Sequence, residues 1–512
     1  MCGPSVYTVN EQYIKLVTRR AGGMSWALMK HPDGIRCDVF VTHAWKEGMF
    51  ELTSKVLNSW PRGAVGAWCC MLANPQNLNI GQLICSPNQS PFAKALRVSR
   101  YMLVVPNHSG SIYCRLWCAY EAYLAYSLEI EIRTATAPTL WDAIPAMSIA
   151  AVSAFAGAGV AATCMLLVGQ INRSSQNLCL GLTLASALVH LYSGQSERRR
   201  IFSLGSAFLA GIQLVVVSDQ HGIVSGRAFS TVHNRLVLAG IVVHCVASEL
   251  DRVLSDVCAR GADELRYGYT GSITQATCSQ KSDEEHIRAE IGEDRIPDVN
   301  RTIAVLLRAG MSTPSLRRAA RAGVDIKNAS HMEFASLTGM FWFGCLLYWE
   351  ILTRPMGPKS VALVSFAMGL NLSLFFFLST WECDRRAFAL KCLNSFGITW
   401  FIWCYLPSML LYAWRAIDMD ASLTFALTTY MIVGVLTMAL SFLNVDGVAR
   451  RLYFGTAIAQ LLVAPFRWPF QQVGLQQDCE DEACRCLTSP KLVNMITSDG
   501  SMFASFEEDE PV

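Results

Sequence analysis

The sequence predicts an N-terminal α/β domain with a parallel sheet, followed by an all-α region that crosses a membrane several times. Between residues 37 and 137, short apolar runs alternate with helical stretches, the pattern of a doubly wound sheet. After residue 140, the apolar residues gather into long runs, several of which exceed the roughly 18 residues needed to cross a bilayer. The chain of 512 residues is 52% hydrophobic and only 16% charged, which fits this division.

Four stretches of the first region are predicted as strands, namely 37–42, 64–72, 101–106 and 129–135. The first three are nearly continuous apolar runs, as expected for strands that are buried on both faces. Helices are predicted between the strands, over 47–59, 90–99 and 115–127. We therefore place the α/β domain at residues 36–137, preceded by an N-terminal extension of residues 1–35.

The apolar region is predicted to contain about eight membrane spans, near 143–168, 178–193, 201–217, 235–249, 334–353, 360–380, 393–414 and 421–443. A further apolar run, 452–466, contains Pro465 and polar breaks, so we assign it to the membrane interface. These segments form a first bundle of about four helices at 141–250 and a second bundle at 334–466. Small residues crowd the first span at 151–162, which permits close helix packing.

Basic clusters predict the orientation of these spans. SERRR (196–200), CDRRAFALK (383–391) and VARR (448–451) follow the second, sixth and eighth spans. Because short cytosolic loops are enriched in Lys and Arg, these three loops are expected on the cytosolic side. The N-terminus lacks a cleavable secretory signal. We therefore expect an integral, multi-pass protein in a lipid bilayer, with both termini in the cytosol.

Two polar segments complete the organisation. Residues 251–333 are predicted as a cytosolic helical insert, either a linker or a partner-binding segment. Its first helix is expected to have Ser282 as its N-cap, with Glu285 at the capping-box position. Further helices at 299–310 and 313–323 are each expected to end at a glycine. The acidic, polar residues 467–512 are predicted to be disordered.

Composition and motifs exclude several classes of function. A net charge of +2 gives no support for nucleic-acid binding. The sequence has no Walker loop, no HExxH motif, no nucleophile elbow and no kinase motif set, and its 19 cysteines form no visible disulfide or metal framework. We therefore expect no metal site. The predicted spans contain few ionisable residues, which counts against a proton-coupled transporter.

The remaining candidate site lies in the α/β domain. Ligands of an open parallel sheet bind at the carboxyl ends of its strands, where Thr42, His43 and Trp45 follow the first strand. Glu121 lies on an otherwise apolar face of the helix 115–127, four residues after Trp117. A carboxylate on an apolar face costs free energy unless it is paired or used. Glu121 is therefore the candidate catalytic residue.

Two motifs in this region resemble those of TIR domains. DVFVTHAW (38–45) is similar to the strand that ends in Phe-x-Ser-His in many members, with Thr42 in place of the serine, and RLWCAYE (115–121) contains Trp-Cys-x-x-Glu in full. The combination with many membrane spans is similar to divergent TIR-like membrane proteins of algal protists. The resemblance implies a flavodoxin-like α/β fold over residues 36–137. The single glycine of the loop 74–90, Gly81, does not reproduce the family's common loop motif.

The resemblance implies two roles, which are self-assembly into signalling complexes and, in some members, cleavage of NAD. In the enzymes the glutamate of Trp-Cys-x-x-Glu is catalytic, which corresponds to Glu121. One carboxylate can stabilise the oxocarbenium-like ribose that forms when nicotinamide leaves. Trp45 or Trp117 could then stack on the nucleotide, and Thr42 or His43 could form hydrogen bonds with it. NAD would be the substrate, and no cofactor is required.

Each residue also has a structural interpretation. Glu121 could pair with Arg97, Arg100 or Arg115 and orient its helix, and His43 could cap the turn after the first strand. Trp45 and Trp117 could be core residues. At the level of function, the preferred hypothesis is membrane-tethered signalling with NAD cleavage at Glu121. The alternatives are a channel or transporter with a TIR-like regulatory domain, and a non-catalytic membrane scaffold.

Overall fold

The computed structural model describes residues 3–78, 84, 86–137, 140–168, 196–219, 228–278, 280–321, 326, 330, 334–335, 337–342, 358–380, 424–436 and 439. The chain divides into two compact units, Met1–Val463 and Ala464–Val512, and every described residue belongs to the first. The tail at 467–512 and the expected membrane segments near 178–193, 393–414 and 452–466 lie outside the described residues.

A five-stranded sheet forms the centre of the α/β domain. The strands are β1 (Val39–Thr42), β2 (Ala67–Cys69), β3 (Tyr101–Val104), β4 (Glu131–Thr134) and β5 (Met311–Ser312), in the order β2-β1-β3-β4-β5. The first four are parallel, and each lies inside a stretch predicted as a strand. Strand β5 pairs antiparallel with β4, which makes the sheet mixed. The α/β fold class is thus confirmed, with one strand that the sequence analysis did not foresee.

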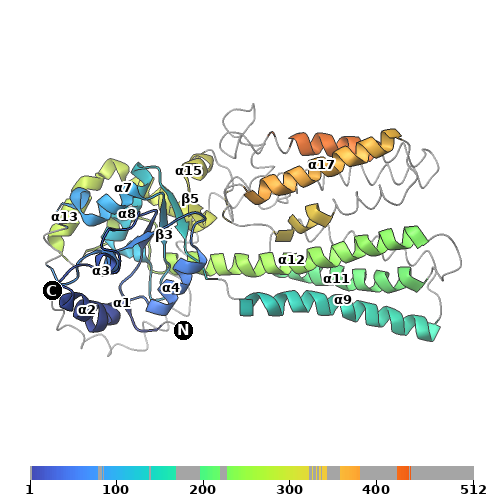
Figure 1. The fold of residues 1–512 in the computed structure, drawn as a ribbon, viewed down its shortest axis with the longest axis horizontal. Helices are drawn as coiled ribbons and strands as arrows, with labels where there is room; N and C mark the ends of the chain where they lie inside the picture. The colour runs from blue at the N-terminus through green and yellow to red at the C-terminus, as the bar shows by residue number, and fades with distance from the viewer. Residues whose placement is uncertain are drawn as a thin grey trace. The chain divides into compact units, whose positions relative to one another are not determined.

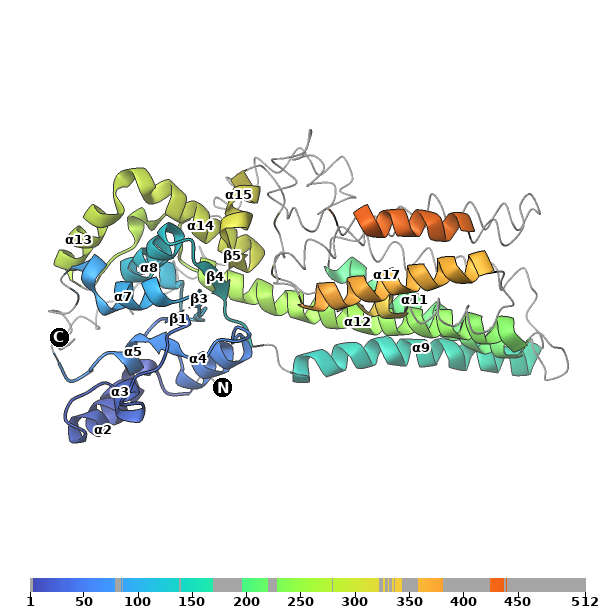
Figure 2. The same ribbon diagram turned by 45° about the horizontal axis from the view of Figure 1, so that its top comes forward.

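Helices cover both faces of the sheet (Figure 2). One face carries the N-terminal segments α1 (Val6–Val9), η1 (Asn10–Ile14), α2 (Lys15–Arg20) and α3 (Trp26–Lys30), together with α4 (Met49–Asn58) and α5 (Cys70–Ala73). The other face carries α7 (Pro91–Val98) and α8 (Leu116–Ser127). Short 3-10 segments are η2 (Pro87–Gln89), η3 (Ile112–Cys114), η4 (Ile273–Gln275) and η5 (Glu293–Arg295). Helices α4, α7 and α8 lie within the ranges predicted from the sequence.

Alternation along β1 explains why the two faces have separate cores. Val39 and Val41 belong to one hydrophobic cluster, and Phe40 belongs to the other. Val6 and Ile14 are buried in the same cluster as Val39. Residues of the N-terminal extension therefore belong to the domain core.

The described residues of the segment 251–333 are mostly helical, but they do not form a separate insert. The segment contains α13 (Lys281–Ile291), α14 (Ile296–Ala309) and α15 (Pro314–Arg321), and it supplies strand β5. Its buried apolar residues share one core with β1, β3 and α8, among them Ile287, Val299, Ile303 and Leu306. Figure 1 shows α13, α15 and β5 on the same domain as α8 and β3. The domain is therefore discontinuous in sequence, which corrects the expected boundary at residue 137.

Two expected helix ends can be compared with the structure. Helix α13 begins at Lys281 with Gln280 at its N-cap, two residues before the N-cap expected at Ser282. Gly310 closes α14 in the left-handed conformation, with φ of 71°, as expected for a helix-terminating glycine. A Cβ at Gly310 would also lie 2.4 Å from Oγ of Ser330, so this turn has little space for a side chain.

The two segments expected to form the membrane bundles, 141–250 and 334–466, are helical wherever the structure describes them. Their helices are α9 (Leu140–Val168), α11 (Ser196–Asp219), α12 (Ala228–Arg266) and α17 (Pro358–Thr380). Within the described residues, one helical stretch, Ala143–Leu167, is long and apolar enough to cross a membrane. Shorter apolar helical stretches are Arg200–Val216, Val361–Phe376 and Thr424–Leu436. The number of membrane crossings therefore stays a prediction.

Helix α12 extends beyond the fourth expected span, whose apolar run stops at residue 249. The helix continues without a break to Arg266, so its 39 residues have a length of about 58 Å. Hydropathy marks where apolar side chains end, but the backbone stays helical because the polar residues that follow are also compatible with a helix.

Helices α9, α11 and α12 pack side by side (Figure 1). A Cβ at Gly157 of α9 would lie 2.0 Å from the backbone O of Phe208, and one at Gly211 of α11 would lie 1.9 Å from the backbone O of Ala154. Ser153 Oγ donates a hydrogen bond to the backbone O of Leu204 at 2.9 Å. The small residues of α9 therefore allow the close packing expected from the sequence.

We expect Gly157→Ala to destabilise the packing of α9 against α11, because its methyl group would overlap the backbone of Phe208. The matched control is Gly159→Ala, since a Cβ at Gly159 meets nothing within 4 Å. The control should be neutral or slightly stabilising, because alanine favours a helix by about 1 kcal/mol over glycine. Thermal unfolding of the full chain in detergent measures both variants. Equal melting temperatures would contradict the close contact.

The discontinuous core predicts that residues 1–137 alone do not form a stable domain. This fragment lacks β5 and exposes the face of α8 that α13 and α14 cover. Joining residues 258–333 to it through a short Gly/Ser linker should restore solubility and cooperative unfolding, measured by circular dichroism and NMR dispersion. A folded, monomeric fragment 1–137 would show that the second segment is dispensable.

Candidate functional site

The candidate site lies at the carboxyl edge of the sheet, where β1 and β2 end. Thr42 is the last residue of β1, and His43 follows it directly. Helix α8 presents Glu121 to the same region. Cys70 lies close to both His43 and Glu121: its thiol contacts the imidazole of His43 and is close enough to Glu121 to interact with it electrostatically. Thr42, His43 and Glu121 are 2%, 4% and 5% exposed. The structure thus brings together three of the five predicted site residues.

Burial determines the protonation of Glu121. Removal from water raises the pKa of its carboxyl group to about 7, and the hydroxyl of Thr42 and the charge of Arg115 oppose this rise. The contact with Thr42 falls short of a full hydrogen bond, because Oγ1 of Thr42 and Oε2 of Glu121 have no hydrogen-bond partner among the described residues. Of the three arginines considered from the sequence, Arg115 is the one whose charge acts on Glu121.

His43 and its neighbouring thiols form an uncharged cluster. The Nε2 atom of His43 lies 3.5 Å from Sγ of Cys69 and 3.3 Å from Sγ of Cys70. Burial lowers the pKa of His43 to about 4 and raises the pKa of Cys69 to about 12. At neutral pH the imidazole is therefore neutral and the thiol is protonated, so this cluster provides no thiolate nucleophile.

Trp45 and Trp117 occupy other places. Trp45 packs in the core on the side of α4 and the N-terminal helices, with its ring centroid 5.3 Å from that of Tyr7. Trp117 stacks on Phe92 at 5.3 Å, and its Nε1 atom donates a hydrogen bond to Asp283 at 3.2 Å. Trp45 and Trp117 therefore belong to opposite faces of the sheet, which agrees with the core interpretation of both residues.

The arrangement allows proton exchange and electrostatic stabilisation at one carboxyl group. With a pKa of about 7, Glu121 is close to half ionised at neutral pH. Its ionised form can stabilise a developing cation, whereas its protonated form can donate a proton. Within the described parts of the chain, no group of three or more His, Cys, Asp and Glu side chains is arranged to hold a metal ion.

Glu47 is a buried carboxyl group that the sequence analysis missed. It is fully buried, and neither of its carboxyl oxygens has a hydrogen-bond partner among the residues described. Burial raises its pKa to about 9; the charge of Lys55 opposes this rise, and those of Glu51 and Glu264 add to it. No local pattern indicates this burial, because Glu47 is simply the first residue of the helix predicted over 47–59.

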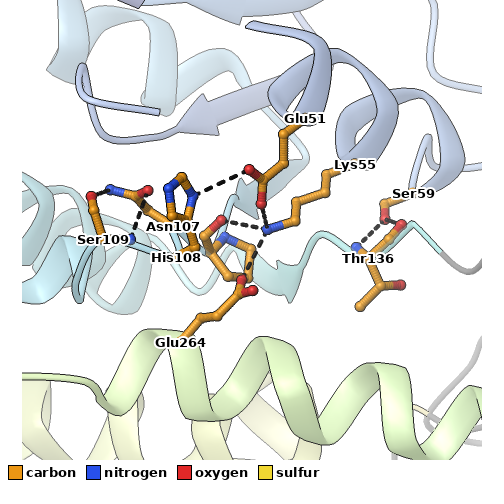
Figure 3. Close-up of polar contacts among 9 residues, drawn as sticks. Glu51, Lys55, Ser59, Asn107, His108, Ser109, Thr136 and Glu264 are labelled. Atoms are coloured by element: carbon orange, nitrogen blue, oxygen red, sulfur yellow. Dashed lines mark hydrogen bonds and ion pairs between the residues drawn. The ribbon is translucent and has the colours of Figure 1, made fainter. Parts of the chain in front are cut away.

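Lys55 connects α4, the loop after β3 and α12 (Figure 3). Its Nζ atom lies 2.7 Å from Oε1 of Glu51 and 2.9 Å from Oε2 of Glu264, and it donates a hydrogen bond to the backbone O of Pro106 at 2.7 Å. The second oxygen of Glu51 lies 3.3 Å from Nδ1 of His108. Glu51 and Lys55 are four residues apart on α4, but the contacts with Pro106, His108 and Glu264 join residues far apart in the sequence, so no local motif could reveal them.

We expect Glu121→Gln to remove a pH-dependent loss of stability. The folded state holds the carboxyl proton more tightly than the unfolded state, whose pKa is near 4.5. The wild type should therefore lose stability relative to the variant as the pH rises from about 5 to about 7, by up to about 3 kcal/mol, and no further above that. Melting temperatures of the full chain between pH 5 and 8 measure the difference.

The control for this measurement is Glu285→Gln, because Glu285 is exposed on α13. Its difference from the wild type should change little over this range. A stability difference for Glu121→Gln that is constant with pH would show that the carboxyl group does not titrate as described.

The three comparisons with known proteins add no relative. Models of known families, curated proteins and solved structures were searched, and none matches the chain. The resemblance to TIR domains thus rests on the two sequence motifs.

Proposed function

We propose that the chain is a membrane-tethered signalling protein that acts through a TIR-like α/β domain in the cytosol, and that Glu121 gives this domain an NAD-cleaving activity. One observation carries the proposal. Glu121 is a buried carboxyl group at the carboxyl edge of a largely parallel sheet, near the hydroxyl of Thr42 and the charge of Arg115. This is the position that the resemblance gives to the catalytic glutamate.

The chemistry follows from the charge of Glu121. Cleavage of the nicotinamide–ribose bond leaves positive charge on the ribose, and nicotinamide departs with the bonding electrons. An ionised Glu121 can stabilise this cation until water adds to it, which yields ADP-ribose and a proton. Thr42 lies next to the carboxyl group and can orient it, while Trp45 and Trp117 are held in the cores and cannot stack on the nucleotide in this conformation.

Several features support attachment to a membrane. Only 22% of the most apolar window of α9 is buried, and Val152, Phe155 and Leu166 on this helix are 63%, 76% and 87% exposed. Large apolar side chains exposed along such a helix suit contact with lipid. The proposal therefore includes several membrane spans with both termini in the cytosol, and self-association of the α/β domains.

A non-catalytic scaffold is the second candidate. It is favoured by the burial of Glu121, which is 5% exposed, and by the core positions of both tryptophans. In such a protein the TIR-like domain assembles with partners or copies of itself, and Glu121 only orients α8.

The NAD-cleaving protein and the non-catalytic scaffold can be distinguished by measuring NAD turnover by the full chain at high density in proteoliposomes. We expect nicotinamide release that falls about 10²–10³-fold in Glu121→Gln, as for loss of a stabilising charge in other active sites. The wild-type rate should rise with pH through about 7, because the ionised carboxylate is the active form. The control Glu285→Gln should keep the wild-type rate. No release from a folded, clustered wild-type sample would leave the scaffold as the function.

A further inference from the structure

The carboxyl end of α12 lies against the edge of the sheet where ligands of parallel α/β domains bind. A Cβ at Gly261 would lie 3.5 Å from Cγ of Pro106 and 3.6 Å from Cγ2 of Thr134, the residues at the carboxyl ends of β3 and β4. Leu265, one turn later, is fully buried in the core with α8. This part of the edge is thus occupied by the chain itself.

One charged cluster fixes α12 at this edge. We call it the Lys55 clamp and define it as Glu51, Lys55, the backbone O of Pro106 and Glu264 (Figure 3). The three donors of the ammonium group match the three acceptors. Lys55, Glu51 and Glu264 have side chains that are 12%, 17% and 29% exposed, so solvent screens their interaction only in part. Glu264 is the member that α12 contributes.

The middle of the same helix packs within the apolar region. A Cβ at Gly240 would lie 2.0 Å from Cδ1 of Trp342, so the backbone of α12 is in close contact with the helical residues 337–342. The carboxylate of Asp251 accepts hydrogen bonds from the backbone N–H groups of Phe334 and Ala335, at 2.8 and 2.9 Å. Gly240 and Glu264 lie on one unbroken helix, about 36 Å apart along its axis.

We propose that the end of α12 is a built-in occupant of the carboxyl edge of the sheet, and that the Lys55 clamp transmits displacements of α12 to the loop after β3. The inference rests on the proposed signalling function, for which it supplies the route from the apolar helices to the α/β domain. A continuous helix moves as a unit, and the clamp ties that unit to the backbone of Pro106 and to α4. Displacement of α12 therefore uncovers or reshapes the edge.

The first test removes the contribution of α12 to the clamp. In Glu264→Gln, the full chain in lipid nanodiscs should show about fivefold faster amide hydrogen exchange at residues 104–111, because one charge-assisted contact of Lys55 is lost. The matched control is Asp263→Asn on the same helix turn. The side chain of Asp263 is 72% exposed, and the ion pair it forms among the described residues is with Arg266 on the same helix, so exchange at 104–111 should not change. Equal exchange in Glu264→Gln and the wild type would overturn the proposal.

The second test asks whether the clamp transmits displacement, which a purely structural contact would not do. Gly240→Leu forces α12 away from Trp342 and should also accelerate exchange at 104–111. In the double variant Gly240→Leu/Glu264→Gln, the leucine should not accelerate exchange at 104–111 further, because the contact between Glu264 and Lys55 is already lost. The control Gly159→Leu places the same side chain on α9 in open space. The proposal would be overturned if the two substitutions had additive effects on exchange at 104–111, or if Gly240→Leu alone had no effect.

Both tests measure hydrogen exchange and not NAD cleavage. The clamp can therefore be confirmed where no nicotinamide is released, and NAD cleavage can be confirmed where the clamp is overturned. Where nicotinamide release is found, Glu264→Gln should change its rate, whereas Asp263→Asn should not.

Discussion

The burial of α8 on all sides is the constraint on which the α/β domain depends. Nine of its twelve residues are buried, and they fill the space between the sheet on one side and α13 and α14 on the other. A helix that is apolar all round cannot remain at a surface without a large cost. The chain therefore has to return after α12 and cover the outer face of α8. Strand β5 and the helices on either side of it are the consequence of this requirement.

The aromatic residues of α8 fix how the returning segment docks. The hydroxyl of Tyr120 donates a hydrogen bond to Glu290 at 2.6 Å, and the hydroxyl of Tyr123 accepts one from Arg295 at 2.6 Å. Trp117 donates a third hydrogen bond, to Asp283. The polar atoms of three aromatic side chains on α8 are thus all bonded to the segment that contains α13 and α14. Apolar burial supplies the driving force, and these hydrogen bonds satisfy the polar atoms that burial would otherwise leave unpaired. Burial of α8 also raises the pKa of Glu121.

Local patterns were sufficient for the elements but not for their partners. Apolar runs and helical periodicity located four strands and three helices of the first segment, because these signals depend on neighbouring residues. They could not show that β5 pairs with β4, since two residues such as Met311 and Ser312 carry no strand signal of their own. Trp117 was placed near the site because it precedes Glu121 by one helical turn. Its ring instead turns to Phe92, whose position depends on a different helix.

The same reasoning explains the two buried ionisable groups, Glu47 and Lys55, whose contacts no local pattern indicates. Glu47 is buried against the N-terminal helices. The backbone N–H of Val6 in α1 donates a hydrogen bond to the backbone O of Glu47 at 2.9 Å. Lys55 contacts Glu264 only because helix α12 continues past residue 249, where its apolar run ends. Helix α12 is an element of two cores at once: its middle packs on Trp342, and Leu265 packs with α8. The order of the sequence places all of α9, α11 and α12 before β5, α13 and α14. The core around α8 therefore becomes complete only after the first apolar helices have been synthesised. This order delays completion of the α/β domain until those helices have been synthesised, although the segments 1–137 and 258–333 contain the residues of its core.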